Sequence, residues 1–457
     1  MNKLWLIIIS FSAAFCAALK PAESSTTTSL NTGKFPAWES AQPGSLAVGR
    51  GGENAPSSAN RIQPGAERLD LYLPLIKGKR VAVFANHTST IGKDNIVDVL
   101  KKKGVTISVI FGPEHGFRGT ADAGAKIGNY VDKQTGIPVV SLYGSKHRPS
   151  ADDLKNVDVL LFDIQDVGTR FYTYISSLQE YMEAAIEHNK PLIILDRPNP
   201  NGFYVDGPVL DTAFRSFVGM QPVPVVYGMT IGEYAYMLAG EQWLQHKITA
   251  TIHIPSSPER AAMQKRTAPT DPKAYSLTII PCAHYTHNDK YVLPVKPSPN
   301  LPDIQSIYWY ASTCYFEGTV LSEGRGTTKP FQLFGHPTLP SSLKSFTPRS
   351  MPGATKPKLM DQLCYGWDLS GTPAQVLDRV HNQVQIGYLL EAYRLFPNKD
   401  SFFLNKGNFF NKLVGNDELI RQMKGGVAEA EIRKSWEPAL GRFKAIRKKY
   451  LIYTDFQ

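Results

Sequence analysis

The sequence predicts an α/β fold in which a doubly wound parallel sheet is followed by a smaller α+β auxiliary domain. Between residues 65 and 240, short runs of branched apolar residues alternate with segments of helical periodicity. Strands that alternate with helices need crossover connections, which are typical of a parallel sheet covered on both faces. After residue 240, Pro and Gly become frequent and helical patterns return only near the end. The length of 457 residues agrees with two or three globular domains at about 150 residues each.

Residues 1–18 are predicted to be an export signal. An apolar run from Leu4 to Leu19 is too short to span a membrane, and small residues precede a cleavage site after Ala18. Cys16 offers a lipidated N-terminus as an alternative, although Phe15 stands where the lipoprotein peptidase needs a small residue. We therefore expect an exported protein, periplasmic or at the cell surface, whose contact with a membrane is limited to a possible anchor at Cys16.

Residues 19–64 are dominated by Ser, Thr, Pro, Gly, Asn and Ala and contain few branched apolar side chains. Such a segment cannot bury enough apolar surface to offset the entropy lost on ordering. We expect a disordered, low-complexity linker between the signal and the first domain.

The first domain, residues 65–240, contains the alternating elements. Its expected strands are 80–85, 106–111, 138–142, 157–163 and 191–196, and its expected helices include 96–103 and 175–188. The auxiliary domain, residues 241–457, has expected strands at 249–254 and 277–281 and helical patterns within 373–393 and 417–450. Only Cys282, Cys314 and Cys364 remain in the mature chain. At most one disulfide is therefore expected, and the fold must rest on its core.

The charge balance favours anionic surroundings. Lys and Arg exceed Asp and Glu by 50 to 40, a net charge of +10 that suits a cell wall, an acidic glycan or a nucleic acid. The basic runs at 101–103 and 447–449 are short and lack interleaved aromatic residues, so no nucleic-acid partner is expected. Gly112 and Gly116 enclose a Glu and a His where a pyrophosphate loop needs bare backbone, so no nucleotide and no other cofactor is expected.

Polar side chains follow each expected strand of the first domain. The carboxyl ends of parallel strands meet at one edge of the sheet, where ligands bind in folds of this class. Single clusters of this kind also cap helices or form turns, but five together predict a functional cleft. The candidates at these ends are Asn86, Glu114, His115, Arg118, Tyr143, Asp163, Asp166, Arg170 and Asn199.

Glu114 is the first candidate for a catalytic group. It lies between Pro113 and His115 after an apolar strand, and a rigid, partly desolvated loop favours the protonated form that a general acid needs. A helix cap or an ion pair with Arg118 is the structural alternative. Asp163 and Asp166 add carboxylates at a neighbouring strand end, and glycoside hydrolysis commonly uses two carboxylates. Their alternative is also structural, with Asp163 holding Arg170 or a turn.

A second polar loop, residues 317–328, lies in the auxiliary domain and contains Glu323 and Arg325 among closely spaced glycines. Such a loop allows backbone and hydroxyl groups to approach a ligand, and an arginine can bind a carboxylate through two hydrogen bonds. An exposed turn is the alternative. The sequence lacks the His-x-x-x-His and His-x-His spacings that would fix two metal ligands locally, so no metal is expected.

Five segments of the sequence resemble a known family, the exo-β-N-acetylmuramidases of the NamZ type, long catalogued as a domain of unknown function. The segments are GPEHGFRG at 112–119, FDIQDVGTRFYTY at 162–174, DRPNPNG at 196–202, PSPNLP at 297–302 and EGTVLSEGRGTTKPF at 317–331. The resemblance implies a Rossmann-like catalytic domain, an auxiliary C-terminal domain and an active site in the cleft between them. It also implies release of N-acetylmuramic acid from the non-reducing end of peptidoglycan fragments without a nucleotide. The family's glutamate in the PEHG motif corresponds to Glu114.

The expected function is therefore that of an exo-acting glycoside hydrolase in cell-wall turnover and recycling. Glu114 would protonate the leaving oxygen, and the second role is left open between Asp163, Asp166, Glu323 and the substrate's own acetamido group. The lactyl carboxylate of muramic acid is expected to bind Arg118, Arg170 or Arg325, and Asn86, His115, Tyr172 and Asn199 complete the expected binding set. Two rival functions remain: a metal-dependent peptidoglycan deacetylase or amidase, and a non-catalytic muropeptide-binding protein.

Overall fold

The computed structural model describes residues 61–119, 128–255 and 275–456, which belong to one compact unit, Pro56–Gln457. The predicted export signal, Cys16 and most of the predicted linker lie outside the described residues. At the end of that linker, Gln63 pairs with Ala283 in an isolated β-bridge, so the chain is already tied to the sheet domain there. No helix within these ranges is long and apolar enough to cross a membrane.

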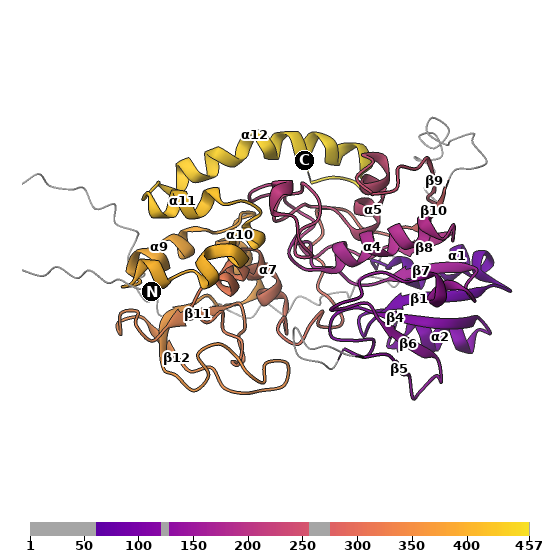
Figure 1. The fold of residues 1–457 in the computed structure, drawn as a ribbon, viewed down its shortest axis with the longest axis horizontal. Coiled ribbons are helices and arrows are strands. Elements are labelled where there is room, and N and C mark those ends of the chain that lie inside the picture. The colour runs from indigo at the N-terminus through magenta and orange to yellow at the C-terminus, as the bar shows by residue number, and fades with distance from the viewer. Residues whose placement is uncertain (1–60, 120–127, 256–274, 457) are drawn as a thin grey trace, which may run out of the picture. The chain divides into compact units, whose positions relative to one another are not determined.

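An eight-stranded sheet forms the centre of the first domain, with the strand order β5-β6-β4-β1-β7-β8-β10-β9 (Figure 1). All neighbouring pairs are parallel except β5 with β6. The strands are β1 (Arg80–Ala85), β4 (Thr106–Gly112), β5 (Tyr130–Val131), β6 (Pro138–Ser141), β7 (Val159–Asp163), β8 (Leu192–Leu195), β9 (Ala250–His253) and β10 (Tyr275–Ile280); a separate two-stranded ribbon joins β2 (Thr90–Ile91) and β3 (Asp94–Asn95). The predicted doubly wound fold is confirmed.

Helices cover both faces of this sheet. The central strands β7 and β8 are almost wholly apolar because both of their faces are buried, whereas both residues of the edge strand β5 are exposed. Residues of α1 (Leu69–Ile76) and α2 (Ile96–Lys102) pack in one core cluster, and residues of α4 (Tyr174–Glu187) and α5 (Ile231–Gly240) pack in the other. Along β1, Val83 belongs to the first cluster and Phe84 to the second, as the alternation of a strand requires. The short α3 (Ala151–Leu154) precedes β7.

The sheet extends beyond the predicted domain boundary at residue 240. Strands β9 and β10 were assigned by the sequence analysis to the auxiliary domain, but β10 pairs in parallel with β8, and Leu277 lies opposite Leu192. The assignment of these two strands is therefore corrected. The surrounding Pro- and Gly-rich sequence obscured a crossover that continues the same sheet.

The C-terminal part combines a small antiparallel sheet with helices. Its sheet has the order β11-β13-β12. The elements are α7 (Ile304–Thr313), β11 (Leu333–His336), β12 (Lys344–Phe346), β13 (Cys364–Asp368), α8 (Pro373–Val380), α9 (Gly387–Leu395), α10 (Asn408–Val414), α11 (Glu418–Lys424) and α12 (Glu429–Arg447). The predicted helix within 373–393 is interrupted at His381 and Asn382, which have φ angles of 49° and 55°. Cys282, Cys314 and Cys364 are buried free thiols.

The end of the chain returns to the first sheet. Helix α12 leads from the C-terminal helices back towards α5 (Figure 1). Beyond it, the Tyr453 hydroxyl donates to Asp196 Oδ2 at 2.6 Å, and the backbone N–H of Ile452 donates to Glu233 Oε1 at 2.6 Å. Both carboxylates are buried. The last residues of the chain therefore supply hydrogen bonds to buried charges of the sheet domain.

Candidate active site

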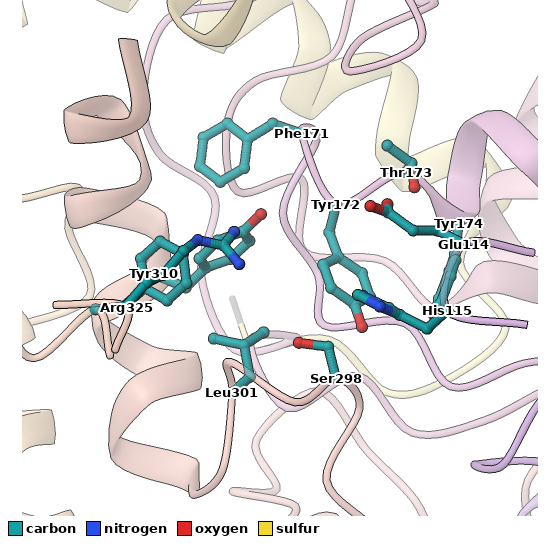
Figure 2. Close-up of a pocket in the computed structure, with 11 residues that line it drawn as sticks. Glu114, His115, Phe171, Tyr172, Thr173, Tyr174, Ser298, Leu301, Tyr310 and Arg325 are labelled. Atoms are coloured by element: carbon teal, nitrogen blue, oxygen red, sulfur yellow. The ribbon is translucent and has the colours of Figure 1, made fainter. Parts of the chain in front are cut away.

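A cavity of about 60 Å³ lies beyond the carboxyl end of β4. Figure 2 shows Arg325 and Tyr310 on one side of this cavity, facing Glu114 and Tyr172 on the other. Its lining comes from both parts of the chain and consists of Glu114, His115, Phe171, Tyr172, Thr173, Tyr174, Ser298, Leu301, Tyr310, Arg325 and Phe331. Aromatic walls with a few charged groups are typical of a small-molecule site.

A second cavity of about 570 Å³ shares Glu114, Phe171, Thr173, Tyr310 and Arg325 with the first. It adds a rim of charged and phenolic side chains, which are Tyr143, Glu317, Glu323, Lys356 and Lys358. Because Glu114 and Arg325 line both cavities, they lie where the two meet. A substrate that occupies both would place a bond between its units next to Glu114.

The Glu114 carboxylate is held by a short, turned loop. The loop reverses directly after β4, with positive φ angles at His115 (68°) and Gly116 (75°). The Tyr143 hydroxyl donates to Glu114 Oε1 at 3.0 Å. Burial raises the pKa of Tyr143, and the negative charge of Glu114 raises it further, so the phenol stays protonated and remains a donor. The structure thus places Glu114 and His115 in the cavity, where the sequence predicted them.

Two tyrosines from the FYTY segment form the wall beside Glu114. The Tyr172 hydroxyl donates to the Pro297 carbonyl at 2.9 Å, and the Tyr172 and Tyr174 rings meet edge to face with centroids 4.7 Å apart. The Asn86 amide donates to the Tyr174 hydroxyl at 2.8 Å. Asn86 is fully buried and is absent from the lining of both cavities, so its predicted contact with substrate is corrected to a role in orienting Tyr174.

Arg325 lies opposite Glu114 and is fixed by two carboxylates. Its Nη2 lies 2.6 Å from Glu317 Oε1 and its Nε lies 3.2 Å from Glu323 Oε1. Lys358 Nζ lies 2.8 Å from the other oxygen of Glu323. Burial alone would raise the pKa of Glu323, but the charges of Lys358 and Arg325 outweigh it and hold the pKa below its ordinary value. Glu323 is therefore an anion that fixes two cations beside the larger cavity, and a catalytic role for it stays a prediction.

Asp163 does not reach either cavity. It forms a two-pronged ion pair with Arg197, with Nε–Oδ1 at 2.6 Å and Nη2–Oδ2 at 2.9 Å, and both side chains are almost completely buried. The predicted catalytic role is corrected to a structural one. The structural alternative had paired Asp163 with Arg170, but Arg170 donates to backbone carbonyls instead.

Asp166 is buried in the turn that follows β7. Its Oδ2 accepts hydrogen bonds from the Gly168 N–H at 2.6 Å and from the Tyr227 hydroxyl. Burial raises the pKa of Asp166 to about 7, although these hydrogen bonds oppose the rise. Asp166 lines neither cavity, so its predicted catalytic role is also corrected.

Three predicted substrate-binding residues form their hydrogen bonds and ion pairs with other groups of the protein. Arg170 is fully buried and donates to the backbone carbonyls of Pro208, Val223, Leu413 and Val414 at 2.7–2.8 Å. Arg118 is paired with Asp98 and Asp132. Asn199 donates to the Met229 carbonyl and accepts from the Asn201 N–H, both at 2.8 Å. Arg118, Arg170 and Asn199 are therefore corrected to structural roles.

Several residues that line the larger cavity were not predicted from the sequence to be functional. Glu317 opens the polar loop 317–328 that the sequence already indicated, but it was not among the predicted catalytic or binding residues. Lys356 and Lys358 lie in an irregular segment without a recognisable motif. Tyr310 is on α7 and looks like a core residue from its spacing. Among the described residues, no group of three or more His, Cys, Asp or Glu side chains is arranged to hold a metal ion.

Comparisons with known proteins agree with this architecture. Residues 81–305 match the family described as exo-beta-N-acetylmuramidase NamZ, N-terminal, and residues 308–453 match its C-terminal counterpart. The peptidoglycan beta-N-acetylmuramidase NamZ of Bacillus subtilis (strain 168) is 37% identical over 420 residues, which cover 88% of this chain and 94% of that protein.

Two solved structures of DUF1343 family proteins from Bacteroides fragilis NCTC 9343 are also similar. One is 41% identical with a TM-score of 0.73 and covers 86% of this chain and 99% of its own. The other is 26% identical with a TM-score of 0.68 and covers 86% of this chain and 100% of its own. Both likenesses extend over the sheet domain and the C-terminal part together.

Proposed function

The chain belongs to the exo-β-N-acetylmuramidase NamZ family, and from this premise we propose how its two joined cavities carry out the hydrolysis. The protein is a glycoside hydrolase that releases N-acetylmuramic acid from the non-reducing end of peptidoglycan fragments. The observation that carries the assignment of its site is the position of Glu114, the carboxylate at the junction of the two cavities.

The smaller cavity is suited to the terminal sugar. Its walls include the rings of Phe171, Tyr172, Tyr310 and Phe331, and aromatic side chains offer large apolar surfaces together with polar edges. The larger cavity then receives the next sugar of the fragment. This arrangement places the glycosidic oxygen at Glu114, which donates the proton that the leaving sugar needs. The hydrogen bond from Tyr143 fixes the direction of the Glu114 carboxyl group.

Arg325 is the one arginine among the three predicted lactate ligands that lines a cavity. Its ion pairs use Nη2 and Nε, so Nη1 takes part in neither. We assign the lactyl carboxylate of muramic acid to this guanidinium, because a charge-assisted hydrogen bond of this kind is strong and directional. Lys356 and Lys358 add positive charge to the rim of the larger cavity.

We also propose that the protein acts outside the cytoplasmic membrane, where its substrate is found. The support is the apolar segment within residues 1–18 and the basic net charge of +10. Lipidation at Cys16 is the alternative to cleavage after Ala18. Fractionation of cells, together with the mass of the mature N-terminus, distinguishes a freely exported protein from a lipid-anchored one.

The proposed function is tested with the mature protein and two chromogenic substrates, an aryl N-acetyl-β-muraminide and the matching glucosaminide. Rapid cleavage of the muraminide alone is the expected result. On a defined peptidoglycan oligosaccharide, free N-acetylmuramic acid should appear from the first time point without internal fragments. Release of acetate or of peptide, in a reaction stopped by a chelator, would instead support a metal-dependent deacetylase or amidase. Binding of fragments without turnover would support a non-catalytic protein.

A further inference from the structure

The larger cavity contains a carboxylate that the function above has not used. Glu317 belongs to the short 3-10 helix Cys314–Gly318 that follows α7, and it lines the cavity together with Glu114. The two carboxylates come from different parts of the chain, Glu114 from the end of β4 and Glu317 from the C-terminal part. The lining of this cavity therefore contains carboxylates from both parts, since Glu323 of the C-terminal part also borders it.

Glu317 and Glu323 both pair with Arg325, but their surroundings differ. Glu323 has 3% of its side chain exposed, and both of its oxygens face a cation, Arg325 on Oε1 and Lys358 on Oε2. Glu317 has 21% of its side chain exposed, and its ion pair with Arg325 uses Oε1. Oε2 of Glu317 lies outside that ion pair. Glu317 can therefore accept a proton from a group in the cavity.

The backbone that carries Glu317 is firmly held. Lys358 Nζ donates to the Phe316 carbonyl at 2.7 Å and to the Thr319 carbonyl at 3.1 Å, so one lysine braces both sides of Glu317. A Cβ atom on Gly318 would lie 2.6 Å from the Phe410 backbone, which shows how closely this turn packs against α10. Such packing is the condition for a catalytic side chain to keep its geometry.

Both carboxylates also act on the same phenol. Burial is the main cause of the raised pKa of Tyr143, and the negative charges of Glu114 and Glu317 both raise it further. Tyr143 donates its hydrogen bond to Glu114. Glu317 is therefore close enough to the Glu114–Tyr143 pair to influence it, as a second carboxylate at one scissile bond must be.

We propose that Glu317 is the second catalytic carboxylate, which takes a proton from the attacking water on the face of the anomeric carbon opposite to Glu114. This inference rests on the proposed function and names the group that it left open. The bond between the anomeric carbon and the leaving oxygen breaks, and that oxygen receives the proton of Glu114. The water oxygen bonds to the anomeric carbon as its proton passes to Glu317. The products are N-acetylmuramic acid and the shortened glycan, which now carries a free hydroxyl group at the cleaved position, and solvent returns both carboxyl groups to their starting forms.

The test compares Glu317→Gln with Glu114→Gln on two substrates with different leaving groups. On an aryl muraminide, whose leaving group needs little protonation, Glu114→Gln should lose much less activity than on the natural disaccharide. Glu317→Gln should lose about 100-fold or more in kcat on both substrates, because attack by water is impaired whatever leaves. The matched control is Glu391→Gln, which changes an exposed glutamate paired with Arg394 and should keep wild-type activity.

Azide distinguishes a catalytic role from mere support of Arg325. In Glu317→Ala, azide should restore turnover and form a muraminyl azide of α configuration, since this anion attacks without giving up a proton. The proposal is overturned if Glu317→Gln stays within about fivefold of wild type, or if azide yields no α-azide. If the wild-type protein does not cleave the muraminide, the proposed function itself fails. Wild-type cleavage with a fully active Glu317→Gln overturns this inference alone.

Discussion

The ends of β4 and β7 lie on the same edge of one sheet, and both looked like parts of an active site in the sequence. After β4, Glu114 faces a cavity that continues into the C-terminal part of the chain. After β7, Asp163 is paired with Arg197 and Asp166 accepts from Gly168 and Tyr227, so the protein itself supplies their partners. The same residue types thus serve chemistry at one strand end and folding at the next.

The difference shows what turns a polar strand end into a site. A buried carboxylate without partners is costly, so Asp163 and Asp166 are satisfied within the protein, whereas Glu114, which accepts from Tyr143, also borders a space that a ligand can fill. At the β7 and β8 ends, where folds of this class usually bind ligands, protein groups donate hydrogen bonds to Asp163, Asp166 and Asp196. The cavity is instead displaced to the β4 end, where the C-terminal part supplies Arg325 and Glu317.

The largest expected effect is a loss of stability when Asp163, at the end of β7, is substituted. Asp163→Asn leaves the buried Arg197 charge without its anionic partner, and loss of one member of a buried pair typically costs about 3 to 5 kcal/mol of unfolding free energy. Urea denaturation measures this loss. Asp158→Asn, at the exposed ion pair with Arg80, is the matched control and should change stability far less. Equal stability of Asp163→Asn and wild type would place Asp163 among the functional residues after all.

Substitution of Glu114, after the end of β4, should lower activity and leave stability unchanged. Glu114→Gln keeps the shape of the side chain but cannot deliver a proton, so kcat on the muramic acid disaccharide should fall by about 100-fold or more. Thermal unfolding of the variant should match that of wild type, because Glu114 borders a cavity rather than a core. A near-normal rate would remove Glu114 from the role of general acid.

The next largest effect is expected on kcat/KM when Arg325, the proposed ligand of the lactyl group, is substituted. Arg325→Lys keeps the charge but loses the planar donor face, and a lost charge-assisted hydrogen bond is worth about 1.5 to 3 kcal/mol. We expect kcat/KM on the muraminide to fall roughly ten- to a hundredfold. Arg118→Lys, at an arginine bound to Asp98 and Asp132, should stay within about twofold of wild type. The assignment of Arg325 is wrong if both variants behave alike.

The smallest effect is a change in how stability depends on pH. Burial raises the pKa of Asp166 to about 7, above the value of about 3.9 in an unfolded chain. Between about pH 4 and 7 the folded protein holds a proton that the unfolded chain has lost, so the free energy of unfolding falls as pH rises through this window. Asp166→Asn removes this titration and should flatten that part of the curve. Urea denaturation of wild type and Asp166→Asn at pH 5, 6, 7 and 8 measures this dependence. An equal slope of unfolding free energy against pH in both proteins would contradict the raised pKa of Asp166.

Much of the fold could be predicted because its signals are local. The expected strand 80–85 coincides with β1, and 106–111 is one residue shorter than β4, since continuous apolar runs between turns identify buried parallel strands. The position of Glu114 in the cavity also followed from a local feature, its place directly after β4. The family resemblance was confirmed by matches to both parts of the chain.

The rest depended on partners that are distant in sequence. The Arg170 guanidinium donates to carbonyls at Leu413 and Val414, more than 240 residues away, so it could not be separated from a substrate-binding arginine by its neighbours alone. Asp163 is likewise paired with Arg197, which lies 34 residues away at the adjacent strand end, so its partner could not be identified from neighbouring residues. Lys358, which braces the turn at Glu317, lies in a segment with no periodic pattern.

The return of the chain end to the first sheet has a consequence for the order of synthesis. Asp196 and Glu233 are made more than 200 residues before Ile452 and Tyr453, which donate to their carboxylates and are among the last residues to be translated. Until then, these two buried acids lack part of their final hydrogen bonding. The domain that begins to form first on the ribosome is thus completed last, and a nascent chain stalled before Ile452 would lack these two donors to the buried carboxylates of Asp196 and Glu233.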